Sequence, residues 1–440
     1  MPPGEKTSAR SRSSSLRAGG ASSGPHTHAY GVRLHACAAQ IMSAAAVRRA
    51  AVYRLLATGP LPSARDASEA LHQPQTAKVT MQEMAALLRS CIDDQDDTAE
   101  DACVTECVRR LREAGDGGER HLDKRLASGV RIVPLAPEAT GFNAWRREEE
   151  PNRSGGTAEW LLPEGAEDKA ERVLFLHGGG YSWYSPSDVY RPFTTRLAAG
   201  TGLAVLAIDY RLAPEYAAPA ALEDALAALR WLWAHGPGGE APARRVLVVG
   251  DSAGGGLALA LMHALHVGEC SEGGVSSAGV RPPSAVVALS PWTDLTSSLP
   301  SYTSRAFDKA TQRGDPVFSD GGEVAAEVAA SVASAAGYVG GSDATDARLS
   351  PVYSPPASLA ALPPTLLVVG DAEVMLCDST EFAARAVEAG AADVRLRVYP
   401  RMWHVFPLYT EACGQRGATL APAVRALSEV SSFIKEVAAG

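Results

Sequence analysis

The sequence predicts an α/β protein whose mainly parallel central sheet carries helices on both faces. From about position 171 onward, short apolar runs alternate with longer stretches of helical periodicity. The runs are apolar at nearly every position, which is typical of strands that are buried on both faces. Alternation of such strands with helices favours a parallel sheet, and the sites of such sheets lie at the carboxyl ends of the strands.

Eight apolar runs are predicted strands, and four stretches are predicted helices in the alternating part. The strands are Val130–Leu135, Ala158–Leu162, Val173–Leu176, Ala204–Ile208, Val246–Val249, Ala285–Leu289, Thr365–Val369 and Val394–Val398. The helices are Pro219–Ala234, Ala253–His266, Ser379–Ala389 and Pro422–Val437. All motifs described below follow directly on the carboxyl ends of these strands.

Residues 1–79 are predicted to form a disordered basic extension. They are rich in Ser, Ala, Gly and Arg, and only Ala44–Leu56 has a weak helical pattern. The extension also fits an organelle transit peptide, and it lacks the apolar core of a secretory signal. We therefore expect a cytoplasmic protein, or an organellar one if residues 1–79 act as a transit peptide.

The composition limits the classes of function. The chain has 440 residues, 46% of them hydrophobic, and no apolar run reaches the length of a membrane span, about 18 residues. Residues 1–80 contain ten Lys and Arg against three Asp and Glu, whereas the remainder has 31 against 47, a net charge of −16. An acidic main part argues against nucleic acid as a partner.

The seven cysteines are scattered and odd in number, which favours a reducing compartment over a disulfide framework. Cys103 and Cys107 lie four positions apart and would share a helix face. No histidines accompany them at ligand spacing, so we expect buried thiols and no metal site.

Two regions outside the alternation are predicted to form a helical cap. Met81–Gly115 has helical spacing interrupted around Asp93–Asp97, which predicts two helices. Between about positions 292 and 362 there is no clean strand, only the helix-like Glu323–Val339, and this interval is too long for a plain connection. We expect residues of about 80–125 and about 293–362 to cover the site, and residues 80–440 to form one domain.

The motif HGGGY, His177–Tyr181, directly follows a predicted strand. Three consecutive glycines allow the backbone to turn its amides outward, and free amides stabilise the oxyanion of a tetrahedral intermediate. His177 is expected to orient this glycine loop. A purely structural glycine turn is the alternative interpretation.

Ser252 lies in GDSAGG, between a predicted strand and a predicted helix. Gly250 and Gly254 flank it at Gly-x-Ser-x-Gly spacing, the arrangement of a nucleophile elbow. The tight turn leaves no room for a Cβ at the flanking positions. The serine hydroxyl then lies at a helix N-terminus, where the dipole and free amides favour a developing negative charge. The amide of Ala253 would add a donor to those of the glycine loop.

His404 lies in RMWHVF, shortly after the last predicted strand and 152 residues after Ser252. At this place a base can reach the nucleophile from a neighbouring strand end. A third residue, an acid, should hold the imidazole in the right tautomer and stabilise the imidazolium. The segment GDAEVMLCD offers three such acids, Asp371, Glu373 and Asp378.

These motifs together resemble the hormone-sensitive-lipase-like family of carboxylesterases. The resemblance covers roughly Val130–Gly440 and includes HGGGY, DYRLAPE, GDSAGG, SPWTDLT and MWHVF in this order. It implies an α/β-hydrolase fold with a helical cap and no cofactor. It also implies Ser252 as nucleophile and His404 as base, and the order Ser, acid, His is that of α/β-hydrolases.

The resemblance also implies roles for further residues. Gly178, Gly179, Gly180 and Ala253 resemble the oxyanion donors of the family. DYRLAPE resembles a structural motif, with Asp209, Arg211 and Glu215 in a buried charge network. Many relatives have Asp-Pro-Leu at the acid position, and Glu373-Val374-Met375 aligns with it, so Glu373 is the predicted acid and Asp371 the runner-up.

We therefore expect hydrolysis of short- to medium-chain carboxylic esters through an acyl-enzyme. The aromatic residues expected to line the pocket are Trp183, Tyr184, Trp292 and Trp403. Two alternatives are a catalytically inactive small-ligand receptor of the same fold, which the presence of His404 disfavours, and an amidase or deacetylase that uses the same serine. The natural ester, the stereochemical preference and the oligomeric state are not predicted.

Overall fold

The computed structural model describes residues 98–114, 121–135, 158–268, 276–308, 313–318 and 337–440. Within these ranges the main sheet has eight strands in the order β1-β2-β4-β3-β7-β8-β9-β10, and a small hairpin pairs β5 with β6. The strands are β1 (Val130–Leu135), β2 (Ala158–Pro163), β3 (Glu171–Leu176), β4 (Ala204–Ile208), β5 (His235–Gly236), β6 (Gly239–Glu240), β7 (Arg245–Asp251), β8 (Ala285–Leu289), β9 (Thr365–Gly370) and β10 (Val394–Tyr399).

The sheet is mainly parallel, as predicted. The strands β4, β3, β7, β8, β9 and β10 pair in parallel, whereas β1 and β2 are antiparallel to their neighbours. The predicted strands Ala204–Ile208 and Ala285–Leu289 match β4 and β8 from end to end. Every residue of β4, β8 and β9 is buried, because helices cover both faces of the sheet.

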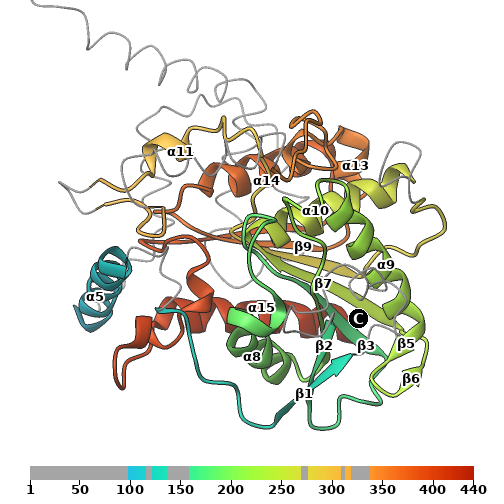
Figure 1. Ribbon diagram of the computed structural model, residues 1–440, viewed down its shortest axis with the longest axis horizontal. Coiled ribbons are helices and arrows are strands. Elements are labelled where there is room, and N and C mark those ends of the chain that lie inside the picture. Colours follow the sequence, from blue (N-terminus) through green and yellow to red (C-terminus); the bar gives the residue numbers. More distant parts are fainter. Residues whose placement is uncertain (1–97, 115–120, 136–157, 269–275, 309–312, 319–336) are drawn as a thin grey trace, which may run out of the picture. The chain divides into compact units, whose positions relative to one another are not determined.

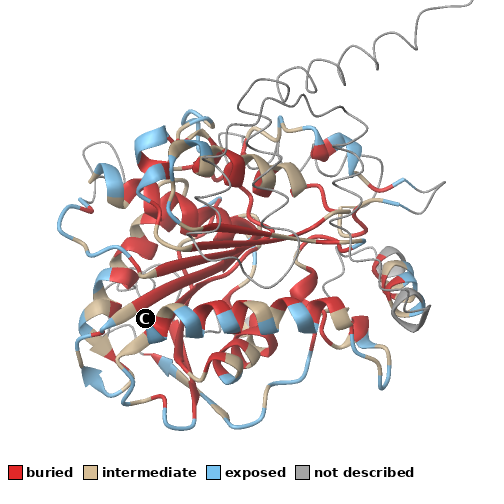
Figure 2. Cartoon of the chain, turned by 180° about the vertical axis from the view of Figure 1, so that it is seen from behind, coloured by how far each residue is buried: buried red, intermediate tan, exposed pale blue. Residues whose placement is uncertain are grey.

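Helices form a layer on each face of the sheet (Figure 1). One layer contains α9 (Ala220–Ala234), α10 (Ser252–Val267), α13 (Pro356–Ala360) and α14 (Leu376–Ala389), and the other contains α8 (Arg191–Thr201) and α15 (Ala421–Ala439). Residues of one strand alternate between the layers: Leu174 belongs to the apolar cluster under α10, and Phe175 belongs to the cluster under α15. Figure 2 shows the buried strands between the two layers, with the exposed residues on the outer faces of the helices.

The remaining elements are short turns of helix and one separate helix. They are α5 (Thr98–Ala114), η2 (Pro186–Tyr190), α11 (Ser301–Ser304), η3 (Pro351–Tyr353), η4 (Phe406–Leu408) and η5 (Ala412–Gly414). The helix α5 lies within the second half of the predicted Met81–Gly115 and packs on η5, whereas the predicted break around Asp93–Asp97 lies outside the described residues. Three predictions lie outside the described residues. They are the first helix of Met81–Gly115, the helical pattern at Ala44–Leu56 and the whole extension 1–79.

The described part of the interval between β8 and β9 contains the short helical elements α11, η3 and α13, all outside the predicted helix Glu323–Val339. Residues 323–336 of the predicted Glu323–Val339 lie outside the described part of the chain, and its last three residues form a bend and turn instead of helix. No helix of the described residues is long and apolar enough to cross a membrane.

Candidate active site

Ser252 lies at the sharp junction of β7 and α10. Its φ of 51° is in the left-handed region, which a non-glycine residue adopts only where the surrounding structure enforces it. A Cβ at Gly250 would collide with the carbonyl oxygen of Gly254, and a Cβ at Gly254 would collide with the carbonyl oxygens of Leu176 and His177. The predicted elbow is therefore present, and its glycines are required by close backbone approach.

His404 lies in the turn between β10 and η4 and faces the serine. Its Nε2 is 2.9 Å from Ser252 Oγ, which is hydrogen-bond distance. The Phe318 ring lies edge-on to the imidazole, with 5.1 Å between the ring centroids. Both the serine and the histidine are buried, and only 8% of Ser252 is exposed. The structure thus brings together two residues that are 152 positions apart in the chain.

Glu373 lies on the loop after β9 and points toward the other side of the imidazole. Its Oε1 is 4.0 Å from His404 Nδ1. Its Oε2 accepts hydrogen bonds from Ser290 Oγ at 2.8 Å and from the Gly370 amide at 3.1 Å. The same Ser290 hydroxyl accepts the amide of Val405, the residue after the histidine. Ser290 therefore connects the acid to the histidine turn.

The two other acids of this segment point elsewhere. Asp371 is half-buried and accepts a hydrogen bond from the Arg401 amide at 2.6 Å. Asp378 is buried, and one of its oxygens accepts the amides of Thr293 and Asp294 and the hydroxyl of Tyr302. Asp378 thereby anchors the loop after β8, which is a structural role. Of the three acids, Glu373 is the one placed beside the imidazole.

The first glycine of the glycine loop is hydrogen-bonded to the elbow. The prediction that the Gly178 amide serves as an oxyanion donor is therefore wrong. The Gly178 amide donates a hydrogen bond of 2.9 Å to Oδ1 of Asp251, so it is not free for an oxyanion. Gly179 and Gly180 have positive φ values of 108° and 59°, and neither amide hydrogen-bonds to an acceptor in the described part of the chain. Ala253 occupies the first turn of α10, where amides lack a partner within the helix.

Asp251 is a buried residue of the motif to which the sequence analysis gave no role. Its two carboxylate oxygens accept the Gly178 amide and, at 3.0 Å, the hydroxyl of Tyr190. Burial raises the pKa of Asp251 to about 7, while these hydrogen bonds act in the opposite direction. The carboxyl of Asp251 therefore sets the position of the glycine loop relative to Ser252.

His177 contacts the glycine loop at the carbonyl oxygen of Gly178. Its Nδ1 lies 2.7 Å from the Gly178 carbonyl oxygen, and its ring stacks on Tyr210 with 4.4 Å between centroids. The Tyr210 hydroxyl in turn donates to the His177 carbonyl oxygen at 2.6 Å. Asp209 Oδ1 lies 4.0 Å from the ring Nε2. These contacts place His177 in the orienting position that the sequence predicted.

The protonation of the site follows from its burial. Burial lowers the pKa of His404 to about 4, and the negative charge of Asp315 opposes this shift. The imidazole is therefore neutral at neutral pH and can accept a proton from the serine. Burial raises the pKa of Glu373, while its hydrogen bonds from Ser290 and Gly370 act to lower it.

The charge network of DYRLAPE differs from the prediction. Arg211 is paired with Asp224 at 2.9 Å and with Glu223 at 3.1 Å, both from α9. Asp209 is buried beside His177, as described above. Glu215 is exposed to solvent, so it is not a member of a buried network. The sequence placed Glu215 in the network by its position in the motif, whereas the partners of Arg211 come from the following helix.

The four aromatic residues proposed for the pocket wall separate into two groups. Trp183 is 50% exposed beside Gly180, and Tyr184 is half-buried. Trp403 is buried in the apolar core, with its ring edge-on to Tyr409. Trp292 is buried, with its Nε1 donating to the Asp294 carbonyl oxygen and its ring edge near Gly180. Trp183 and Trp292 therefore flank the glycine loop, and Trp403 is a core residue.

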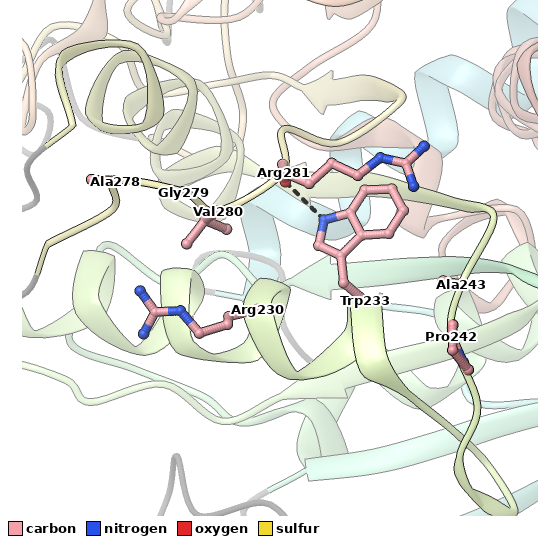
Figure 3. A pocket seen from close by; sticks show the side chains of 8 residues that line it. All are labelled: Arg230, Trp233, Pro242, Ala243, Ala278, Gly279, Val280 and Arg281. Carbon is pink, nitrogen blue, oxygen red and sulfur yellow. Dashed lines mark hydrogen bonds between the residues drawn. The ribbon is translucent and has the colours of Figure 1, made fainter.

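Neither the described cysteines nor the surface pocket forms an arrangement like that of Ser252, Glu373 and His404. Cys107 is buried and Cys103 is half-buried on α5, and neither is in a disulfide bond. No group of three His, Cys, Asp or Glu in the described ranges could hold a metal ion. A surface pocket is lined by Arg230, Trp233 and Arg281, among others (Figure 3). Its residues Pro242 and Ala243 precede the first residue of β7, whereas Ser252 follows the last residue of that strand.

The polar side chains that line this pocket make contacts with other residues of the protein. The Trp233 Nε1 donates to the Arg281 carbonyl oxygen, and the Arg281 guanidinium lies 4.0 Å over the Trp233 ring (Figure 3). Arg230 donates to the Ser276 carbonyl oxygen, and Arg281 donates to that of Arg244. We assign no chemistry to this pocket.

Comparisons with known proteins agree with the observed fold. The family model of the alpha/beta hydrolase fold matches residues 173–408. An acetyl-hydrolase of Streptomyces hygroscopicus is 36% identical over 253 residues, which cover 58% of this chain and 73% of the relative. The carboxylesterase/phospholipase LipF of Mycobacterium tuberculosis is 30% identical over 362 residues, which cover 77% of this chain and 87% of the relative.

Solved structures give the same result. The esterase EstE5 superposes with a TM-score of 0.58 at 27% identity, covering 77% of this chain and 99% of EstE5. An esterase from the bacterial hormone-sensitive lipase family superposes with a TM-score of 0.57 at 29% identity, covering 77% of this chain and 98% of that esterase. This chain belongs to the hormone-sensitive-lipase-like family of α/β-hydrolases and is a serine hydrolase of the carboxylesterase type.

Proposed function

We propose that Ser252, His404 and Glu373 are the nucleophile, the base and the acid of a carboxylesterase. His404 Nε2 takes the serine proton as Oγ attacks the ester carbonyl. As the tetrahedral intermediate collapses and the ester C–O bond breaks, the imidazolium gives this proton to the leaving oxygen, which departs as the alcohol and leaves an acyl-serine. Water activated by the same imidazole then hydrolyses the acyl-serine to the carboxylic acid. The observation that carries this proposal is the 2.9 Å separation of Ser252 Oγ and His404 Nε2 at the start of α10.

The proposed oxyanion hole consists of the amides of Gly179, Gly180 and Ala253. Two of them come from a loop of positive φ, and the third belongs to the first turn of a helix whose dipole favours negative charge. Gly178 is left out because its amide is donated to Asp251. Its proposed task is to fix the loop that presents the next two amides.

The proposed substrates are small esters of short- to medium-chain acids. The serine is 8% exposed, so an extended substrate surface cannot reach it without rearrangement. One relative carries the name acetyl-hydrolase, and the similar EstE5 was crystallised and soaked with p-nitrophenyl butyrate. Both point to short acyl groups.

A series of p-nitrophenyl esters from acetate to palmitate tests the substrate class. We expect turnover of the acetate and butyrate, a decline with longer chains, and no turnover by Ser252→Ala. Absence of turnover at every chain length would favour a small-ligand receptor. Faster cleavage of a matched p-nitroanilide series would favour an amidase.

We also propose that residues of about 80–125 and about 293–362 cap the site within one domain formed by residues 80–440. Phe318 and Asp315, both from the second segment, support this because they lie against His404. From the first segment, α5 packs on the turn Ala412–Gly414, shortly after the histidine. Removal of residues 1–79 should leave ester turnover intact if this division is right.

The proposed compartment is the cytoplasm, with an organelle as the alternative if residues 1–79 act as a transit peptide. Four cysteines of the described residues are not in disulfide bonds, which supports a reducing compartment; they are Cys103, Cys107, Cys377 and Cys413. Imaging of the full chain and of a chain without residues 1–79, each fused to a fluorescent protein, distinguishes the two.

A further inference from the structure

Asp315 is a fully buried carboxylate to which the sequence analysis gave no role. It comes from the interval between β8 and β9, and none of it is exposed. Its Oδ1 accepts the Val317 amide at 3.1 Å and the His404 amide at 3.4 Å, and its Oδ2 accepts the Val374 amide at 3.2 Å. One carboxylate therefore connects three segments that are far apart in the chain.

Two of these segments carry the proposed acid and base. Val374 directly follows Glu373, and the third amide belongs to His404 itself. Asp315 thus holds the backbone on each side of the 4.0 Å gap between the Glu373 carboxylate and the imidazole. A change in the position of Asp315 would change the relative position of the two side chains.

Asp315 is itself fixed in place by its own segment. Its amide donates to the Arg305 carbonyl oxygen at 2.9 Å. Gly314 has a φ of 97°, and a Cβ there would lie 2.5 Å from the Ala306 carbonyl oxygen and 2.7 Å from that of Arg305. Three residues after Asp315, the Phe318 ring lies against the imidazole. The segment 313–318 is therefore built to present Asp315 to the histidine turn.

The surroundings of His404 allow a second carboxylate, that of Asp315, to stabilise the imidazolium. In the described part of the chain, Ser252 Oγ lies at Nε2 of the imidazole, Glu373 Oε1 lies 4.0 Å from its Nδ1, and Asp315 accepts the His404 amide and acts on the imidazole through its charge. The charge of Asp371 raises the pKa of Glu373. Burial raises the pKa of Asp315 to about 7, with the Glu373 charge raising it further and the imidazole opposing. When Ser252 transfers its proton, the resulting imidazolium lies among buried groups, where a nearby negative charge is strongly stabilising.

We propose that Asp315 is a positioning residue of the esterase, which holds the backbone of Glu373–Val374 and of His404 and adds a second carboxylate that stabilises the His404 imidazolium. This inference rests on the proposed triad. The proposed role differs from a purely structural one because its effect on kcat depends on the charge of Asp315 and therefore on pH. A purely structural anchor would need the same hydrogen bonds at every pH.

The test compares Asp315→Asn with the wild type from pH 5 to pH 9, using p-nitrophenyl butyrate and measuring kcat and KM. At pH 5 the wild-type Asp315 is protonated and neutral like asparagine, so the two enzymes should differ only by the backbone hydrogen bonds that the side-chain NH2 of the variant cannot accept. Above pH 7 the wild type gains the charge that the variant lacks, and its kcat should exceed that of Asp315→Asn by about 10- to 100-fold, with KM changed by less than about 2-fold. His404 is neutral throughout this range.

The control is Asp343→Asn, which removes an exposed carboxylate of the same interval. Its kcat should equal that of the wild type at every pH. If Asp315→Asn does not fold, the smaller and neutral Asp315→Ser takes its place with the same expected ratio.

Two outcomes would overturn the inference. A kcat ratio that is independent of pH, together with a lower unfolding free energy, would make Asp315 a structural residue only. Equal activity of variant and wild type at all pH values would remove it from the site altogether. Ser252→Ala separates these outcomes from failure of the triad, since turnover that survives this substitution would contradict the proposed function itself.

Discussion

Oε1 of Glu373 lies 4.0 Å from Nδ1 of His404, beyond hydrogen-bond distance, and within the described residues neither atom makes another hydrogen bond. Catalytic hydrogen bonds are often long in the free enzyme and tighten in the Michaelis complex. The other oxygen of Glu373 is held by Ser290 and Gly370. The glutamate is therefore anchored at one oxygen and available to the imidazole at the other.

The first prediction concerns the identity of the acid. Glu373→Gln should lower kcat/KM by about 10²- to 10⁴-fold, because the amide cannot stabilise the imidazolium as a carboxylate does. Asp371→Asn is the matched comparison on the same loop and should stay within a few-fold of the wild type, since Asp371 bonds to the Arg401 amide. Steady-state kinetics with p-nitrophenyl acetate give both values.

The reverse order of these two effects would assign the acid to Asp371. Circular dichroism of both variants is the necessary control, because only a folded Glu373→Gln variant reports on catalysis.

The second prediction concerns Ser290, which connects the acid to the histidine turn. Ser290→Ala removes the hydroxyl that donates to Glu373 and accepts the Val405 amide. We expect kcat to fall by about 10-fold or more, because hydrogen bonds to charged groups contribute about 1.5–3 kcal/mol. Ser304→Ala, an exposed position at the end of α11, is the control. Unchanged kcat in a folded Ser290→Ala variant would show that the hydroxyl does not position the acid.

The third prediction concerns close backbone approach at the elbow. In Gly254→Ala the new Cβ would meet the carbonyl oxygens of Leu176 and His177, which precede the glycine loop. Overpacking of this kind costs about 1–3 kcal/mol, and displacement of an oxyanion donor lowers kcat by about 10²-fold or more. Gly238→Ala has open space around the added Cβ and should change neither property. Urea unfolding and kcat measure the two effects, and a Gly254→Ala variant with normal values of both would contradict the packing described here.

The fourth prediction concerns the pH dependence of stability. Burial raises the pKa of Asp251 from 3.8 to about 7. Between these pH values the folded protein keeps a proton that the unfolded chain has released, so the contribution of Asp251 to the unfolding free energy falls as the pH rises toward 7. Asp251→Asn keeps the shape of the side chain and removes this titration.

The unfolding free energy of Asp251→Asn relative to wild type should therefore increase from pH 5 to pH 8. Chemical denaturation at several pH values measures this difference, and Glu240→Gln, which changes an exposed carboxylate, serves as the control. A relative stability that is constant over this range would show that Asp251 ionises at its ordinary pKa.

Short-range patterns in the sequence were sufficient for the fold class and for the proposed nucleophile and base. Continuous apolar runs are dictated by burial on both faces of a sheet, and β1, β4 and β8 match the predicted strands from end to end. The spacing of Gly250 and Gly254 around Ser252 reveals the elbow, and the steric requirement at Gly250 is local because a Cβ there would meet Gly254; the requirement at Gly254 comes from Leu176 and His177, far away in the chain. The short helices α11, η3 and α13 were not predicted, since they are too short to show a helical period.

Only the tertiary structure decided the contacts of residues whose partners lie far away in the chain, although the family resemblance had already favoured Glu373 as the acid. The tertiary structure placed Glu373, and not Asp371 or Asp378, beside the imidazole, and it engaged the Gly178 amide with Asp251. Ser290 and Asp315 reach partners 83 and 89 positions away, respectively. Local sequence sets which residues can occupy a turn or a strand, whereas the distance between two loops is set by how the strands beneath them pair.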